Sequence, residues 1–149
     1  MSTLEEDLAD LVTEAVNPDN AMLDTMSVAE LADLMNRADA TVAGAVRAAL
    51  PAIVAVIEAT AARMQAGGRL VYVGAGTAGR IGVVDASECP PTFSSPPEQV
   101  FAIMAGGPNA IVTPTEGAED DAQAGASAVE AAGIGPLDTV VGIASSGRT

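Results

Sequence analysis

The sequence contains no histidine, no tryptophan and no lysine, and its only cysteine is Cys89. A single cysteine cannot form an internal disulfide, and a reducing compartment is the simpler setting for it. Because histidine is absent and cysteine nearly so, the usual ligands of a zinc site are missing and we expect no metal. The missing histidine also argues against Cys89 as a nucleophile, since no imidazole can act as its base.

Positive charge is scarce as well: six arginines stand against 20 acidic residues, for a formal net charge of −14. This balance excludes the basic surface of a nucleic-acid-binding protein and argues against adhesion to an anionic membrane. No basic stretch precedes an apolar core at the N-terminus, so no signal peptide is predicted. The longest apolar runs fall short of a membrane span. We therefore expect a cytoplasmic protein without nucleic-acid or membrane partners.

What the chain does have is aliphatic bulk. Its 149 residues are 49% hydrophobic but only 2% aromatic, so they can bury one core packed with alanine, valine, isoleucine and leucine. The hydrophobic period changes near residue 68, from a helical pattern to alternating strands and helices. We assign residues 1–68 as an N-terminal helical segment that packs on the sheet of a domain over residues 69–149.

The helical segment carries its own start and stop signals. A helix is predicted over residues 1–16, and Ser27–Glu30 has the spacing of a capping box that starts a short helix. Asp39 can cap a longer helix, which Pro51 should kink or divide. Gly67-Gly68 ends it.

The second part has an α/β pattern. Continuous apolar runs predict strands over 69–73, 100–105 and 139–144, which favours a parallel sheet covered by helices on both faces. The intervening helices are predicted over 77–87 and 120–132, with a proline-rich loop over 88–98. Since the chain stops directly after a strand, we expect it to be the N-terminal piece of a larger domain with an incomplete sheet.

A glycine loop follows the first strand. Gly74–Gly79 matches the dinucleotide fingerprint, but the second strand ends in Ala105-Gly106-Gly107 without the acid that a ribose needs. Hydroxyls follow the third strand instead, at Ser145, Ser146 and Thr149, which favours a compact phosphate monoester. Arg80 and Arg148 lie in these two loops, and each could bind the phosphate or form a surface salt bridge.

Several segments together resemble one enzyme family. GAGTAGRIGVVDASECPPTF, AGGPNA, EGAEDD and VVGIASSGRT, with TEAVNP and LMNRAD near the N-terminus, are similar to N-acetylmuramic acid 6-phosphate etherases. This family belongs to the sugar isomerase (SIS) domain superfamily. The resemblance covers essentially the whole chain but about the first half of a family member. It implies a three-layer, flavodoxin-like parallel sheet flanked by helices.

The resemblance also implies a function. Family members convert a cytoplasmic amino-sugar 6-phosphate with a D-lactyl ether at C3 into N-acetylglucosamine 6-phosphate and D-lactate, in peptidoglycan recycling. They use no metal or organic cofactor and form homodimers. Their catalytic glutamates fall on Glu88 and Glu119. Their phosphate-binding positions fall on two loops, here Gly76, Thr77, Ala78, Ser145, Ser146, Gly147 and Thr149.

The chemistry requires two carboxyl groups in opposite protonation states. With the sugar ring open, a base removes the C2 proton, an acid protonates the departing lactyl oxygen, and water adds to the unsaturated aldehyde. The resemblance suggests Glu88 as the acid and Glu119 as the base, and the sequence alone would allow the reverse.

Two features of the chain depart from the family pattern, and three rival functions stay open. Ala78 stands where family members usually have serine, and the truncation predicts that the 149-residue chain alone is inactive. The leading rival is a sugar-phosphate-sensing regulator of the glucokinase-regulatory-protein type, which would not need both glutamates. A sugar-phosphate isomerase and a dinucleotide-binding oxidoreductase are the others.

Overall fold

The computed structural model describes residue 15 and residues 17–145, and it divides into two compact units, residues 1–57 and residues 58–149. The helix predicted over residues 1–16 lies almost wholly outside the described residues. The predicted domain division after residue 68 stays a prediction.

The described part of the first unit contains two short 3-10 helices, η2 (Pro18–Asn20) and η3 (Leu23–Thr25). The long helix α2 (Val28–Gln65) follows them and continues into the second unit. The predicted capping box is confirmed. The Ser27 amide donates to the Glu30 carboxylate at 2.8 Å, and the Glu30 amide donates to the Ser27 hydroxyl at 3.3 Å. The Ser27 hydroxyl also donates to the Glu30 carboxylate at 2.6 Å, and this bond, followed by that of the Ser27 amide, lowers the pKa of Glu30. The two amide bonds satisfy donors that the start of a helix leaves without partners.

α2 runs without interruption, so the prediction of a short helix followed by a second one from Asp39 is wrong. No glycine or proline lies between residues 28 and 43, and an ion pair between Arg37 and Asp33 supports this stretch one turn apart. Pro51 lies inside α2 and does not divide it. The predicted stop is confirmed: the Gly67 and Gly68 amides donate to the Met64 and Arg63 carbonyls, a Schellman motif.

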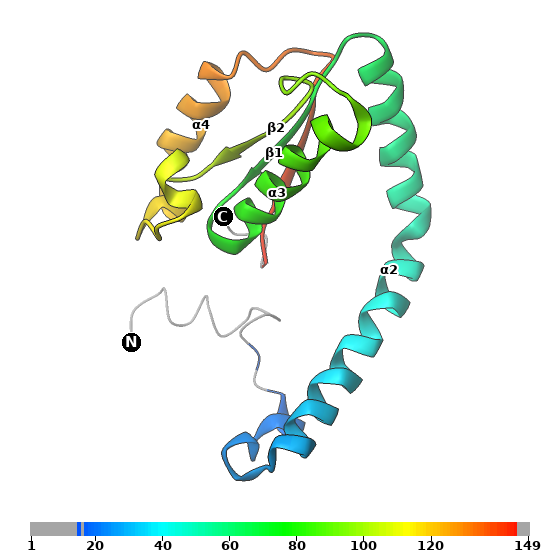
Figure 1. Cartoon of the computed structure of the whole chain (residues 1–149), viewed down its shortest axis with the longest axis vertical. Coiled ribbons are helices and arrows are strands. Elements are labelled where there is room, and N and C mark those ends of the chain that lie inside the picture. Colours follow the sequence, from blue (N-terminus) through cyan, green and yellow to red (C-terminus); the bar gives the residue numbers. More distant parts are fainter. Residues whose placement is uncertain (1–14, 16, 146–149) are drawn as a thin grey trace. The chain divides into compact units, whose positions relative to one another are not determined.

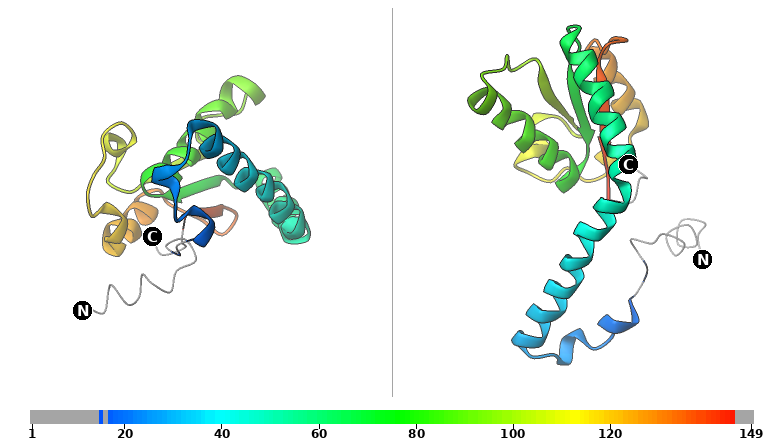
Figure 2. Two further views of the ribbon diagram at one scale, coloured as in Figure 1. Left: turned by 90° about the horizontal axis from the view of Figure 1, so that it is seen from below. Right: turned by 90° about the vertical axis from the view of Figure 1, so that its right-hand side faces the viewer.

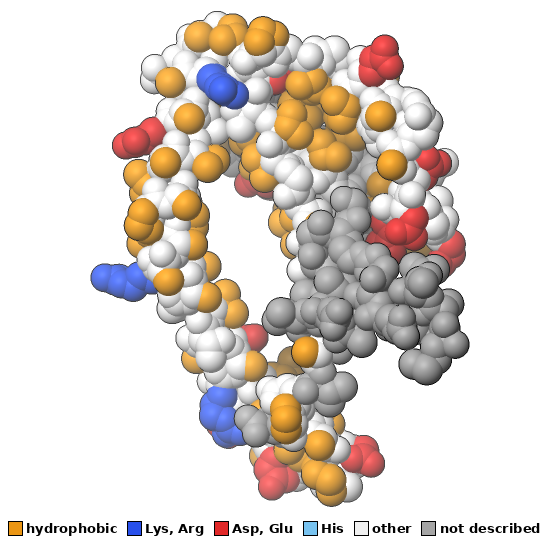
Figure 3. Space-filling model, turned by 180° about the vertical axis from the view of Figure 1, so that it is seen from behind, with side chains coloured by type: hydrophobic (Ala, Val, Ile, Leu, Met, Phe, Trp, Pro, Cys, Tyr) orange, Lys and Arg blue, Asp and Glu red, His pale blue; other side chains and the backbone are white. Residues whose placement is uncertain are grey.

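α2 is also more apolar than the sequence predicted. By length and composition alone it could cross a membrane, and it is the one helix among the described residues that could. This differs from the expectation that every apolar run falls short of a span. Core helices of soluble proteins pass the same test, and Arg47 would carry a charge into such a span. Figure 3 shows apolar side chains exposed along α2. Val42, Val46 and Ile57 are among the large apolar residues of this helix that are exposed.

The second unit is built on a three-stranded parallel sheet, as predicted, and its strand order is β2-β1-β3 (Figure 1). The strands are β1 (Leu70–Gly74), β2 (Val100–Met104) and β3 (Thr139–Ile143). In register, Gly74 lies opposite Met104 on one side and Ile143 on the other. All three carboxyl ends therefore meet at the same edge of the sheet.

Helices cover both faces of this sheet. α3 (Gly76–Phe93) lies on one face and α4 (Ala122–Ala131) on the other, which gives the three-layer arrangement (Figure 2). Two further 3-10 helices, η4 (Pro108–Ile111) and η5 (Ala118–Asp120), interrupt the connection from β2 to α4. The apolar core is small: Val71 is fully buried and Val100, Met104 and Ala110 nearly so.

α3 is longer than predicted at both ends. It begins at Gly76 and includes Pro90 and Pro91, so residues 88–93 are helical and not part of a loop. Proline lacks the amide that the helix ladder uses, so Pro90 and Pro91 cannot donate to the carbonyls of Ala86 and Ser87, four residues earlier. The helix ends at Ser94, in the left-handed conformation, whose amide donates to the Pro90 carbonyl at 2.9 Å.

Candidate functional site

The glycine turn between β1 and α3 lies at the carboxyl edge of the sheet, and its glycines have distinct roles. A Cβ on Gly79 would lie 2.5 Å from the Gly74 carbonyl oxygen and 2.5 Å from the Met104 sulfur. A Cβ on Gly74 would lie 2.8 Å from the Ile143 carbonyl oxygen. Gly76 instead supplies a positive φ of 54°. The turn thus brings the start of α3 unusually close to the sheet.

The start of α3 is suited to an anion. No side chain caps it, and its first turn holds no acidic residue. The amides of Gly76, Thr77 and Ala78 belong to the first turn, where the helix supplies no carbonyl partner. Thr77 is exposed and adds a hydroxyl, whereas Ala78 is half-buried and adds none. This end of α3 therefore has the donors that the phosphate hypothesis requires.

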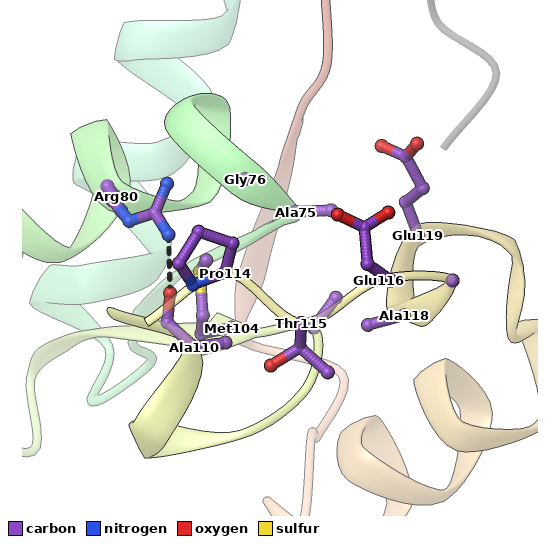
Figure 4. Close-up of a pocket in the computed structure, with 12 residues that line it drawn as sticks. Ala75, Gly76, Arg80, Met104, Ala110, Pro114, Thr115, Glu116, Ala118 and Glu119 are labelled. Carbon is purple, nitrogen blue, oxygen red and sulfur yellow. Dashed lines mark hydrogen bonds between the residues drawn. The ribbon is translucent and has the colours of Figure 1, made fainter. Parts of the chain in front are cut away.

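A cavity of about 190 Å³ lies beside this helix start (Figure 4). It is bordered by the glycine turn, the end of β2 and the loop that follows η4. Two of its lining side chains are carboxylates, Glu116 and Glu119, both exposed. Glu119 was predicted as a catalytic residue. Glu116 was not, and its place at the start of the same EGAEDD segment is the only signal for it in the sequence.

Glu119 also borders a larger hollow of about 870 Å³, between α4 and the sheet. Glu119 lies in η5, whereas the sequence predicted it at the start of the alanine-rich helix. Asp121 caps that helix instead, accepting a hydrogen bond from the Ala124 amide at 2.8 Å. Asp121 is therefore the capping residue of α4. The Glu119 carboxylate is exposed and borders both cavities.

Glu88 lies elsewhere. It is exposed on α3 and lines a third hollow of about 440 Å³ together with Thr77, Ile81 and Val84. Apolar side chains flank Glu88, but its carboxylate remains exposed to water. Thr77 reaches this hollow and Gly76 reaches the first cavity. Glu119 thus lies beside the start of α3, whereas Glu88 lies about three turns further along that helix. The two glutamates line different cavities, and the structure does not bring them into one.

Of the two roles predicted for Arg80, the surface salt bridge does not occur among the described residues, and the phosphate contact stays a prediction. Its guanidinium donates to the Ile111 carbonyl at 2.7 Å and to the Ala110 carbonyl at 2.8 Å. Arg80 is a link between α3 and η4, and it lines the first cavity at the same time.

The loop after β3 is described only at its start. Ser145 is exposed and follows the strand directly. Ser146, Gly147, Arg148 and Thr149 lie outside the described residues, so their predicted phosphate role stays a prediction.

A polar cluster on α3 belongs to the scaffold. The Tyr72 hydroxyl donates to the Asp85 carboxylate at 2.6 Å, and burial followed by this hydrogen bond raises the pKa of Tyr72 to about 12. Cys89 donates to the Asp85 carbonyl, and burial raises the pKa of its thiol. Such a thiol is a poor nucleophile at neutral pH. Within the part of the chain that the structure describes, no cluster of three acidic, cysteine or histidine side chains could hold a metal ion.

Comparison with known proteins adds to this geometry. Residues 52–149 match the family described as the glucokinase regulatory protein N-terminal SIS domain. An N-acetylmuramic acid 6-phosphate etherase of Streptomyces avermitilis is 54% identical over 147 residues, 99% of this chain and 47% of the relative. Relatives of the same name from Rubrobacter xylanophilus and Gloeobacter violaceus are 52% and 55% identical, over 98% and 93% of this chain and 48% and 45% of their own lengths. The chain spans about half the length of the curated relatives it matches.

Proposed function

This chain belongs to the SIS-domain family, and we propose that the full-length protein cleaves the D-lactyl ether of N-acetylmuramic acid 6-phosphate as a carbon–oxygen lyase. The products would be N-acetylglucosamine 6-phosphate and D-lactate. The proposal rests on the similarity to the named etherases over nearly the whole chain. The proposed substrate carries a phosphate dianion, and the chain offers few positive charges to hold one. The proposal therefore assigns the phosphate to a place where backbone amides can bind it.

One observation supports this site above the others: the uncapped start of α3 lies beside a cavity bordered by Glu119. Amides at a helix start bind phosphate through hydrogen bonds and the helix dipole. A sugar held there by its 6-phosphate would extend into the cavity with its carbon atoms facing the carboxylates.

The reaction then follows from the aldehyde form of the sugar. Glu119, as carboxylate, removes the C2 proton, and the electron pair moves to form a C2–C3 double bond as the C3–O bond breaks. A protonated Glu88 supplies the proton to the departing lactyl oxygen. Water adds its oxygen to C3 and a proton returns to C2. The assignment of base and acid follows the family resemblance.

The separation of the two glutamates bears on assembly. Glu88 is flanked by Ile81 and Val84, which are 59% and 61% exposed. Apolar side chains this exposed on one helix face favour a covered surface. We therefore propose that the full-length protein is a cytoplasmic homodimer and that Glu88 faces substrate only when this surface is covered. The 149-residue chain alone should release no measurable lactate.

Isotope labelling tests the chemistry. In water enriched in ¹⁸O, elimination followed by water addition places the heavy oxygen at C3 of N-acetylglucosamine 6-phosphate and leaves D-lactate unlabelled. In D₂O, deuterium appears at C2. Label in lactate instead would contradict the proposed bond cleavage. A ketose product with the lactyl ether intact would identify a sugar-phosphate isomerase, and tight NADH binding an oxidoreductase.

A sugar-phosphate-sensing regulator is the second candidate, because the matching family is described from glucokinase regulatory protein. Such a protein would bind a sugar phosphate and release no product. Calorimetry with N-acetylglucosamine 6-phosphate, run beside the lactate assay, separates the two. Binding without any turnover of the etherase substrate would favour the regulator.

A further inference from the structure

Arg80 joins two segments that are far apart in sequence. It lies in the second turn of α3, and its Nε donates to the Ile111 carbonyl. One terminal nitrogen donates to the preceding carbonyl, that of Ala110 (Figure 4). Two donors in a fixed fork match two neighbouring acceptors, which a lysine ammonium cannot reproduce in the same geometry. Charged hydrogen bonds of this kind are stronger than neutral ones. Arg80 therefore holds η4 against α3 in a defined position.

The loop over residues 105–119 depends on this link. Among the described residues, no other side chain outside the loop has a hydrogen bond to it. The glycines at 106, 107 and 117 all have positive φ, so the loop backbone is intrinsically permissive. It carries Glu119 near its end. The anchor provided by Arg80 is therefore the main restraint on where this carboxylate lies.

Close packing connects the segment that Arg80 anchors to the segment that holds Glu119. Ala110 is only 3% exposed. A Cβ built on Gly106 would lie 3.1 Å from the Ala110 Cβ and 3.0 Å from the Thr115 Cβ. These three residues are thus in close contact, and Thr115 lies four residues before Glu119. Moving η4 would displace Thr115 and with it the acidic segment.

We propose that Arg80 is a positioning residue that sets the place of Glu119 beside the start of α3. It acts through η4 and does not contact substrate. The catalytic part of this inference rests on the proposed etherase function, whereas the structural part does not.

The test compares Arg80→Gln and Arg80→Lys with Arg47→Gln, which removes the same charge from the exposed surface of α2. Amide hydrogen exchange is measured over residues 112–119 of the full-length protein, with the β1 amides as an internal reference. Losing hydrogen bonds to a charged group should speed loop exchange about tenfold to a hundredfold in Arg80→Gln. Arg80→Lys should give a smaller increase, and Arg47→Gln none.

Kinetics supply the second readout. For lactate release, Arg80→Gln should lower kcat by a similar factor while KM changes by less than about twofold. Unchanged loop exchange overturns the inference, as does a loss confined to KM, which would make Arg80 a substrate ligand. Faster exchange at β1 in Arg80→Gln would mean that this variant loosens the sheet as well as the loop, and Arg80→Lys then decides. Loop exchange at the wild-type rate in Arg80→Lys would overturn the inference. If the wild type releases no lactate but loop exchange responds, only the proposed function fails.

Discussion

The two ends of the sheet differ in how they are held. At the amino end, the Arg69 guanidinium contacts the Asp138 carboxylate at 2.6 Å and the Gly133 carbonyl at 2.9 Å. Asp138 also accepts from the backbone amides of Arg69 at 2.8 Å and Gly135 at 2.9 Å. At the carboxyl end, the carboxylates of Glu116 and Glu119 have no such partner among the described residues and border open cavities.

This difference separates stability from function. A carboxylate with several hydrogen bonds and an adjacent guanidinium is committed to one structure, and Arg69 additionally lies 5.3 Å from the centre of the Phe101 ring. A carboxylate that borders a cavity without a partner is available to a ligand. The amino end therefore supports the fold, and the carboxyl end carries the proposed chemistry.

The largest expected effect is on catalysis at the carboxyl end. Glu119→Gln should lower kcat for lactate release by about 10²–10⁴-fold, the usual contribution of a general base. Its unfolding temperature should stay at the wild-type value, because the side chain is exposed. Glu130→Gln, a change on the exposed face of α4, is the matched control. Wild-type turnover in the Glu119 variant would show that the base lies elsewhere.

Gly79→Ala tests the close approach of α3 to the sheet. Its added Cβ would lie 2.5 Å from the Gly74 carbonyl oxygen, and forcing a methyl into such a contact should cost about 1–3 kcal/mol of unfolding free energy. Gly125→Ala in α4 meets nothing within 4 Å and should instead stabilise by up to about 1 kcal/mol. Urea unfolding of both variants measures the difference, and equal effects would contradict the packing described.

Breaking the amino-end pair should affect stability alone. Asp138→Asn removes the charge that Arg69 faces, and we expect the unfolding temperature to fall by about 2–4 °C, measured by calorimetry. Sugar-phosphate binding by the folded variant should be unchanged, since the pair lies at the other end of the strands. A large loss of affinity at temperatures where the variant is folded would mean that the two ends are coupled.

The smallest effect is on acid stability. The Arg69 hydrogen bond, followed by the Gly135 amide, holds the pKa of Asp138 well below its ordinary value. A pKa lowered by folding contributes stability above the unfolded value of about 4 and loses it as the pH falls further. The difference in unfolding temperature between wild type and Asp138→Asn should therefore be largest near pH 6 and should decrease as the pH falls below about 4. A gap that widens in acid would contradict this assignment.

Most of the fold could be predicted because its strands are continuous apolar runs. Each predicted strand agrees with the structure to within a residue at either end, and the parallel order follows from the intervening helices. The extension of α3 through Pro90 and Pro91 could not be predicted. Local rules place a break at proline, whereas the helix continues to the left-handed Ser94, whose amide donates to the Pro90 carbonyl.

The site was harder to predict, because it depends on contacts between distant segments. The glycine turn was found from local spacing alone, and its position at the strand ends follows from the parallel sheet. The partners of Arg80 lie 30 and 31 residues further along the chain, and no pattern around Arg80 indicates them. The separation of Glu88 from Glu119 is likewise a result of tertiary structure, since one lies on a helix and the other in a loop.

The central claim is that the carboxyl end of the sheet binds a sugar phosphate. Backbone amide NMR of the isotope-labelled protein, titrated with N-acetylglucosamine 6-phosphate, tests it most directly. The account predicts chemical-shift changes at Gly76, Thr77 and Glu119, with little change at Arg69 and Asp138. Changes centred on the Arg69–Asp138 end, or none at the start of α3 at saturating ligand, would contradict it.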